Sequence, residues 1–242
     1  MTEFKGVSIV TGAVTETDAL RRTINFIKEN CNPADLTEII IGYPDRATPQ
    51  CLEVINELAS AESQVPVWAF LQSRPKLGFL TECFDAAKGS HIITVDSDLA
   101  LDISLIPQMI ELAKQEPDTI FSASRWLGGS SFKGYNPLKK MWNFCAQKFL
   151  SVLFGGNLTD YTIPFQIVPA ELFKKINFEE TGFPIFLEMV LKPLRLGCKF
   201  KELPSDCSGR TEGKSSNSFL QTAMYLKTAL HIRFLPKDKI LK

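Results

Sequence analysis

The first half of the chain alternates between short apolar runs and longer segments with helical periodicity. Five apolar runs predict strands at residues 5–12, 36–43, 65–71, 90–96 and 118–124. Four periodic segments between them predict helices at residues 15–30, 48–60, 77–89 and 104–117. Strands that alternate with single helices form a mostly parallel sheet with helices on its faces, because a parallel crossover needs a helix-sized connection. We therefore predict an α/β fold.

The second half is less regular. It predicts a long helix at 136–156, a strand and short helix at 165–176, a helix interrupted near Pro193 at 183–197, and a strand at 198–205. A polar, glycine-containing loop at 206–218, which we expect to be mobile, precedes an amphipathic helix at 219–235. We predict one domain over residues 1–218, followed by a C-terminal amphipathic helix and tail over residues 219–242.

Composition restricts the partners of this chain. Its 242 residues contain 27 Lys and Arg against 27 Asp and Glu, so no net charge attracts nucleic acid, and an anionic ligand needs a local cluster. The six cysteines form no CxxC pair and the two histidines are far apart, which argues against structural zinc. We expect neither a secretory signal nor a membrane-spanning helix, since no apolar run approaches about 18 residues.

The fourth predicted strand ends on two acidic residues. In "HIITVDSDLALD", an apolar strand runs into Asp96 and Asp98, separated only by Ser97. Ligands of parallel sheets bind beyond the carboxyl ends of the strands. Two such carboxylates can converge on Mg²⁺ or Mn²⁺, which commonly bridges carboxylates to substrate phosphates. The alternative is that one or both aspartates simply cap the following turn, and the D-x-D pattern alone does not separate the two.

The surrounding motifs resemble those of family-two glycosyltransferases, which have the GT-A fold. "SRPKLGFLTECFDAAKGSHIITVDSDL" is similar to the family's R-x-x-G-x-x-x-A-x-N-x-G segment and its D-x-D, and "VSIVTGAVTETDAL" and "LTEIIIGYPDRATPQ" are similar to its first two strand ends. Four later segments resemble the polyprenol-phosphate sugar synthases, such as the dolichol-phosphate mannose synthases: "FSASRWLGGS", "NPLKKMWNFCAQKFLSVLFGGNLTD", "GFPIFLEM" and "KELPSDCSGRTEGKSS". The resemblance covers the chain to about Ser218.

The chain departs from the family pattern at several positions. Val10 replaces a proline of the first motif, and only Asp45 is left of an acidic pair in the second. Ala100 stands where the polyprenol synthases usually have a glutamine that can join the metal shell. The family's T-S-G-F turn is "TIPF" at residues 162–165, so the local backbone must differ.

The resemblance implies a set of site residues. Asp96 and Asp98 would hold Mg²⁺ or Mn²⁺ and, with Arg125 and Arg210, form the catalytic group. The implied substrate-binding residues are Thr11, Glu16, Asp45, Arg74, Lys76, Gly78, Lys139, Lys140, Glu188 and Ser215. For some of these a plain structural reading stands beside the functional one: a solvated helix start for Lys139 and Lys140, a helix-face charge for Glu188, and a solvent-facing loop position for Ser215.

The expected function is a metal-dependent, inverting transfer of a hexose from a GDP- or UDP-sugar to a polyprenyl phosphate. An ionised lipid phosphate needs no protein base, but cations must stand between the two anionic substrates. The enzyme would be peripheral at the cytoplasmic membrane face, with the helices at 136–156 and 219–235 in the interface or packed on the protein's own core. One alternative is a glycan or soluble hydroxyl acceptor, with Glu188 as base. Another is a nucleotide-sugar-binding protein without turnover.

Overall fold

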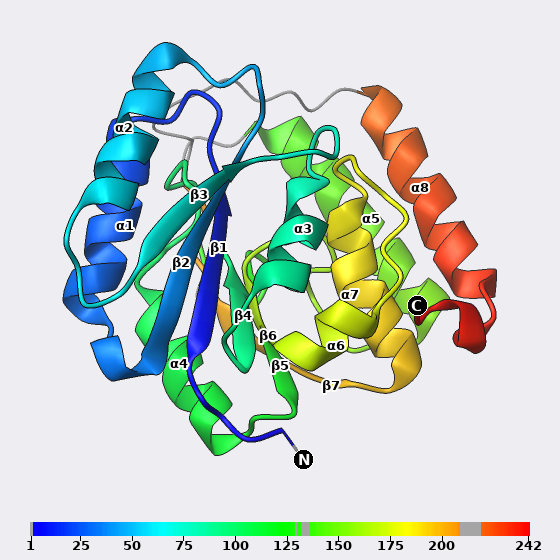
Figure 1. The fold of residues 1–242 in the computed structure, drawn as a ribbon. Helices are drawn as coiled ribbons and strands as arrows, with labels where there is room; N and C mark the ends of the chain where they lie inside the picture. Colours follow the sequence, from blue (N-terminus) through cyan, green and yellow to red (C-terminus); the bar gives the residue numbers. More distant parts are fainter. Residues whose placement is uncertain (1, 129, 132–135, 209–218) are drawn as a thin grey trace.

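The computed structural model describes residues 2–128, 130–131, 136–208 and 219–242, with only the backbone described for Lys139 and residues 219–222. Within these residues, seven strands form one sheet in the order β3-β2-β1-β4-β6-β5-β7 (Figure 1). The strands are β1 (Val7–Gly12), β2 (Leu36–Tyr43), β3 (Val67–Leu71), β4 (His91–Thr94), β5 (Thr119–Ser124), β6 (Gln166–Pro169) and β7 (Lys199–Pro204). Neighbouring strands are parallel except β6, which is antiparallel to β4 and β5. The predicted α/β class is confirmed.

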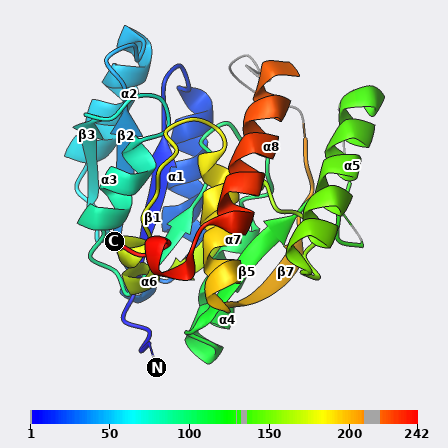
Figure 2. The ribbon, with the colours of Figure 1, turned by 90° about the vertical axis from the view of Figure 1, so that its right-hand side faces the viewer.

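Helices cover both faces of the sheet (Figure 1). They are α1 (Asp18–Asn30), α2 (Pro49–Ser60), α3 (Phe79–Ala86), α4 (Leu105–Gln115), α5 (Pro137–Phe154), α6 (Ala170–Lys175), α7 (Ile185–Leu196) and α8 (Phe219–Phe234). Because successive strand residues point to opposite faces, Ile9 packs in the core with α1, α2 and α4, whereas Val10 packs with α3, α6 and α7. A third core cluster joins α5, α7 and α8, which stand on one flank of the molecule (Figure 2).

The strand register brings several chain segments to one end of the sheet. Val10 of β1 pairs with Ile40 of β2 and Thr94 of β4, so these parallel strands finish together. Gln166, the first residue of antiparallel β6, pairs with Thr94 and with Ser122 of β5. The segment that precedes β6 therefore arrives where the parallel strands end. We call this region the carboxyl end of the sheet.

Helix α7 is continuous where the sequence predicts an interruption. It runs from Ile185 to Leu196 with Pro193 inside its last turn, so the predicted break is wrong. A proline so close to the end removes a single N–H from the helical ladder. The helix stops at Gly197, whose φ of 87° lies in the left-handed region and whose N–H donates to the carbonyls of Pro193 and Leu194.

Helix α8 is not amphipathic over its described side chains, contrary to the sequence-based prediction. Ala229 and Ile232 are buried against the third core cluster. Other apolar side chains of the same helix are exposed, namely Met224, Leu226, Leu230 and Phe234. Apolar residues thus lie on both sides of α8. The predicted domain boundary at residue 218 stays a prediction.

Candidate functional site

The carboxyl end of the sheet gathers the acidic pair and the predicted arginine. Val95 continues the pairing of β4 with β1 through an N–H bond to the Val10 carbonyl, and Asp96 follows. Arg125 follows directly after β5, and the segment that precedes β6 contributes residues 159–162. These segments meet because β6 runs antiparallel between β4 and β5. Asp96, Asp98 and Arg125 are thereby brought to one region, at the strand ends where the sequence placed the acidic pair and near which the family resemblance implied the arginine.

The D-x-D turn has a constrained backbone. Asp98 is buried and one of its oxygens, Oδ1, accepts the N–H of Ala100 at 2.9 Å, so the capping alternative holds for this oxygen. The Ser97 hydroxyl donates to the Gly12 carbonyl at 2.6 Å and fixes the turn to β1. Leu99 has a φ of 56°, in the left-handed region that non-glycine residues rarely adopt. Such strain is found where a turn must hold side chains in one place.

The segment after β7 is tied to the D-x-D turn. Cys207 forms an antiparallel bridge with Leu101, and the Ser208 N–H donates to the Ala100 carbonyl at 3.0 Å. Burial raises the pKa of the Cys207 thiol, and the nearby carboxylates of Asp160 and Asp98 raise it further, against the lowering effect of Arg125. The beginning of the predicted polar loop therefore lies beside the acidic pair. Arg210 and Ser215, which sequence reasoning placed in this loop, lie outside the described residues.

Arg125 forms a two-pronged ion pair with Asp160. Its Nε donates to Oδ2 at 2.7 Å and its Nη2 donates to Oδ1 at 2.8 Å. Nη2 also donates to the Thr162 hydroxyl at 2.9 Å. The Asp160 side chain is fully buried and that of Arg125 is 14% exposed. Two parallel N–H···O bonds fix the orientation of the guanidinium plane, so Arg125 offers a directed cation rather than a mobile charge.

The backbone of residues 159 and 160 is held by Glu202 of β7. Its carboxylate accepts the N–H groups of Thr159 and Asp160, each at 2.9 Å to Oε1, and burial raises its pKa despite these bonds. Sequence reasoning did not single out Asp160. The signal that could have found it is the acidic residue that begins "DYTIPF", the segment that resembles the family's D-x-T-S-G-F motif, but its partner Arg125 is 35 residues earlier in the chain.

Tyr225 is a second residue that the sequence did not reveal. It lies on α8, is partly buried, and packs against the cluster that joins α5, α7 and α8. Burial raises its pKa, as do the charges of Asp160 and Asp96, while Arg125 opposes them. Helix α8 therefore brings a phenol within electrostatic range of Asp96, Asp160 and Arg125.

The predicted nucleotide-side residues surround the ends of β1 and β2. Glu16 accepts the N–H groups of Val14 and Thr15 at 2.8 and 3.0 Å, and so stabilises the loop after β1. Thr11 is buried, and its hydroxyl has no hydrogen-bond partner in the described part of the chain. Asp45 is exposed in the turn after β2. Of these three side chains, only the Glu16 carboxylate accepts hydrogen bonds from the backbone of its own loop.

The predicted basic loop is shaped by Gly78. A Cβ at this position would lie 2.4 Å from the Arg74 Cβ and 3.0 Å from the Pro75 carbonyl, so only glycine permits this close approach. Arg74 is exposed and donates to the Thr81 hydroxyl at 2.7 Å, and Lys76 is exposed with a φ of 57°. The predicted role of Gly78 thus has a backbone-packing explanation in the structure.

Glu188 supports a turn of the chain in this geometry, and its predicted site role stays a prediction. It is buried, lies 2.6 Å from the Lys192 Nζ, and accepts the N–H groups of Glu179 and Glu180. The same turn presents the Thr181 carbonyl, which accepts the Leu77 N–H at 2.8 Å. Glu188 therefore holds a turn that supports the basic loop. The geometry gives no support to the predicted contact with substrate or cation.

Lys139 and Lys140 lie at the start of α5. The Lys140 side chain is exposed, and the Lys139 side chain is outside the described part. A solvated helix start and a phosphate contact both fit this placement, so their predicted role stays a prediction.

The acidic pair fits the protein's share of a Mg²⁺ or Mn²⁺ site. Among the described residues, no group of three or more His, Cys, Asp or Glu side chains gathers as a complete cage. Such cations usually keep several waters and take one or two carboxylates together with substrate phosphates. Asp96 and Asp98 can supply those carboxylates, and the remaining ligands would come from a diphosphate and water.

A sheet of this topology, with an acidic pair after a central strand, defines the GT-A class of glycosyltransferase fold. The chain belongs to glycosyl transferase family 2, whose profile matches residues 8–177.

Two curated relatives are similar over most of the chain. It is 22% identical over 223 residues to glycosyltransferase AglD of Haloferax volcanii, a match that covers 86% of this chain and 34% of that protein. It is 26% identical over 161 residues to the undecaprenyl-phosphate 4-deoxy-4-formamido-L-arabinose transferase of Aeromonas hydrophila, covering 66% of this chain and 48% of that protein. The chain thus spans between a third and a half of the length of these relatives.

Solved structures confirm the fold. Glucosyl-3-phosphoglycerate synthase from Mycobacterium tuberculosis, in complex with Mn²⁺, UDP and phosphoglyceric acid, superposes with a TM-score of 0.68 at 15% identity. The match covers 96% of this chain and 80% of that chain. Another solved structure, of a mycobacterial protein, superposes with a TM-score of 0.70 at 14% identity, over 97% and 76% of the two chains. At these identities the likeness establishes the fold alone.

We predict that Asp160→Asn destabilises the protein by about 3 kcal/mol, because it leaves the largely buried Arg125 guanidinium without its countercharge. Urea unfolding measures this loss. The matched control is Glu57→Gln, which removes the exposed ion pair with Arg21 and should leave the unfolding midpoint within error of the wild type. Equal midpoints for both variants would show that the Arg125–Asp160 pair does not stabilise the fold.

Proposed function

We propose that this chain transfers a hexose from a nucleotide diphosphate sugar to a polyprenyl phosphate at a membrane surface. One observation carries the proposal: Asp96, Asp98 and the Arg125–Asp160 pair share one end of the sheet, beside a helix whose outer face is apolar and exposed. The family assignment and the curated relative named for undecaprenyl phosphate support it.

The donor would bind with its diphosphate near Asp96 and Asp98. A divalent cation held there would neutralise the charge that develops on the departing diphosphate. The turn that carries both aspartates is fixed to β1 by Ser97 and to the segment after β7 by Ser208, so the carboxylates need little reorganisation. The base and ribose would lie over the ends of β1 and β2, near Thr11, Glu16 and Asp45. A solved neighbour of the same fold binds UDP and Mn²⁺, which supports a nucleotide diphosphate and a divalent cation as ligands of this class of fold.

The acceptor phosphate would lie against Arg125. Its oxygen is ionised at neutral pH, so attack on the sugar needs no protein base. The chain must instead reduce the repulsion between two anionic substrates, and a guanidinium of fixed orientation suits a phosphate. Asp160 keeps that guanidinium in place through its two bonds. Lys139, Lys140, Arg210 and Ser215 are further candidates for phosphate contacts.

The apolar surface of the molecule is concentrated on two helices. Among the described residues, every exposed large apolar side chain except Leu71 and Leu241 lies on α5 or α8. On α5 they are Leu138, Met141, Trp142, Phe144, Phe149 and Val152. The two helices are joined by a bond from the Arg233 Nε to the Leu153 carbonyl at 2.9 Å. We propose that this shared face lies in the membrane interface, where aromatic side chains are favourable.

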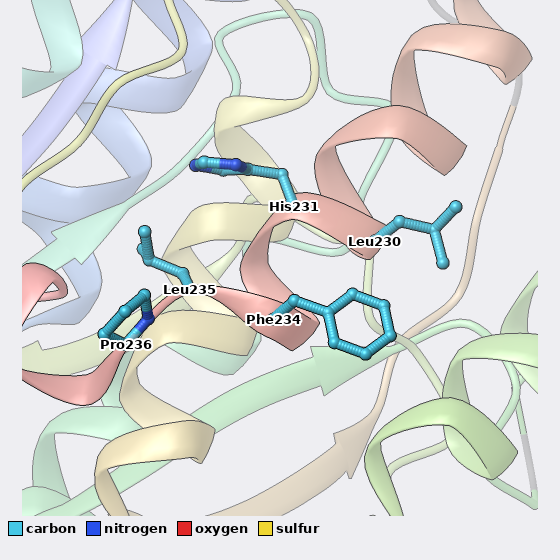
Figure 3. A pocket seen from close by; sticks show the side chains of 5 residues that line it. All are labelled: Leu230, His231, Phe234, Leu235 and Pro236. Carbon is cyan, nitrogen blue, oxygen red and sulfur yellow. The ribbon is translucent and has the colours of Figure 1, made fainter.

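The end of α8 adds a shallow apolar hollow to that face. An open pocket of about 440 Å³ is lined by Leu230, His231, Phe234, Leu235 and Pro236 (Figure 3). Leu230 and Phe234 project to one side of α8, and His231 points away from them toward its 3.2 Å contact with Glu179 (Figure 3). Within the described residues, no helix is both long and apolar enough to cross a bilayer. Contact with lipid would therefore be made from the membrane surface by these helices.

Two alternative functions would give a different product or none. The solved neighbour named for phosphoglyceric acid has a soluble acceptor, and a sugar hydroxyl acceptor would need a base. Glu188, the base that the sequence suggested for that reaction, is committed to Lys192 and the 179–180 backbone. A nucleotide-sugar-binding protein would bind donor and form no product. The nature of the labelled product separates all three.

Incubation with a radiolabelled UDP- or GDP-hexose, Mn²⁺ and polyprenyl phosphate should move label into an organic-extractable, acid-labile product. Asp98→Asn should lower the initial rate by about 100-fold or more, since it removes a charge that acts on the leaving group. Asp238→Asn, at an exposed position near the C-terminus, is the matched control and should keep the wild-type rate. Label in a water-soluble product would instead support a hydroxyl acceptor. Binding of the donor without any labelled product would support a nucleotide-sugar-binding protein that is not an enzyme.

Replacing Trp142 and Val152 together by glutamine should weaken binding to phosphatidylcholine–phosphatidylglycerol vesicles, measured by sedimentation, by about 100-fold or more. These side chains are 57% and 85% exposed, and burial of one large apolar side chain contributes on the order of 1.5–3 kcal/mol. Leu71→Gln is the control, because Leu71 is 49% exposed on β3, across the molecule from α5 (Figure 2). Vesicle binding that is unchanged by the double replacement, or lost equally in the control, would contradict the proposed membrane face.

A further inference from the structure

The inner face of α5 carries one buried amide that contacts the site. Gln147 is 3% exposed, although it belongs to the helix with the most exposed apolar side chains. Its Oε1 accepts the Tyr161 N–H at 2.7 Å, and its Nε2 donates to the Thr162 hydroxyl at 2.9 Å. Both ends of the amide therefore bond the segment that supplies Asp160.

One atom separates Gln147 from the guanidinium of Arg125. The Thr162 Oγ1 accepts from the Gln147 Nε2 and also from the Arg125 Nη2, and it donates to the Asp160 Oδ1 at 3.2 Å. This hydroxyl thus uses its one proton and both lone pairs. Its position is set jointly by α5 and by the ion pair.

A second connection reaches the residue after Arg125. The Asn143 Oδ1 accepts from the Gln147 Nε2 at 3.2 Å and from the Trp126 indole Nε1 at 3.0 Å. Asn143 and Gln147 are four residues apart, so they lie on the same side of α5. Helix α5 is therefore bonded to both chain segments that orient the guanidinium, the Trp126 side and the Thr162 side.

We propose that Gln147 is a positioning residue that sets the orientation of the Arg125 guanidinium relative to α5. The proposal rests on the proposed function for the role of Arg125 as a phosphate ligand. Its consequence is that the helix whose outer face contacts lipid and the cation that receives the lipid phosphate form one bonded unit. The lipid tail would hold the acceptor phosphate at a fixed depth relative to the membrane surface. The Arg125 guanidinium, bonded to α5, would be held at the same depth.

The chemistry of the amide gives the test its variants. Gln147→Met keeps the length of the side chain and removes all three bonds, those with Tyr161, Thr162 and Asn143. Gln147→Glu keeps an acceptor for the Tyr161 N–H but has no N–H for Thr162 and adds a negative charge near Asp160. Gln108→Met is the matched control, because Gln108 is exposed in the middle of α4.

The first readout needs no activity. In protein labelled with ¹⁵N-arginine, the Arg125 Nε–H resonance is assigned by its loss in Arg125→Lys. In Gln147→Met and Gln147→Glu, with the fold verified by circular dichroism, we expect this resonance to shift and its exchange with water to accelerate by about tenfold or more. Gln108→Met should leave both unchanged. An Arg125 resonance with wild-type shift and exchange in either folded Gln147 variant would overturn the proposal.

The second readout is kinetic. With polyprenyl phosphate as acceptor, both Gln147 variants should raise the acceptor KM by about tenfold and leave the donor KM unchanged. A smaller folded fraction would lower kcat alone, and a wild-type acceptor KM would contradict the positioning role. If the wild-type protein forms no lipid product, the proposed function fails, while the arginine resonance still decides whether Gln147 orients Arg125.

Discussion

The ion pair between Arg125 and Asp160 is the interaction on which the architecture of the site depends. It joins the end of β5 to the segment before β6, and this is possible only because β6 enters the sheet antiparallel between β4 and β5. If β6 were parallel to its neighbours, its last residue would lie at the carboxyl end of the sheet. Residues 159–162, which precede β6, would then lie at the opposite end of the sheet. The direction of one short strand thus determines which charges meet.

A buried ion pair is costly unless its remaining hydrogen-bonding groups are satisfied. Here Thr162 accepts from the guanidinium, and Glu202 holds the backbone N–H groups of Thr159 and Asp160. The pair is therefore part of a connected polar network at the base of the site. Such a network gives little mobility to its members, which suits a cation that must face a phosphate in one orientation. The same network continues through Gln147 and Asn143 to helix α5.

Much of the fold follows from local patterns in the sequence. The apolar runs predict the parallel strands, and the rule that ligands bind where such strands end directs attention to Asp96 and Asp98, while the family resemblance implies Arg125. Their roles in a site stay predictions. Asp160, Gln147 and Tyr225 escaped prediction because their significance comes from partners far away in the chain, on other elements. The local pattern also led to the wrong prediction that α8 is amphipathic. Its apolar side chains pack in the core on one side and are exposed on the other. Glu188 matched a family motif, yet the fold uses it to hold a turn through Lys192 and backbone N–H groups.

The central claim is that this end of the sheet binds a nucleotide diphosphate through a divalent cation on Asp96 and Asp98. The most direct measurement is electron paramagnetic resonance of free Mn²⁺ during titration with protein, with and without UDP or GDP. Since two ligands that share contacts strengthen each other's binding equally, the account predicts that a nucleotide tightens Mn²⁺ binding. Replacing Asp96 or Asp98 by asparagine should abolish that increase. Mn²⁺ binding that is indifferent to the nucleotide, or unchanged in both variants, would contradict the account.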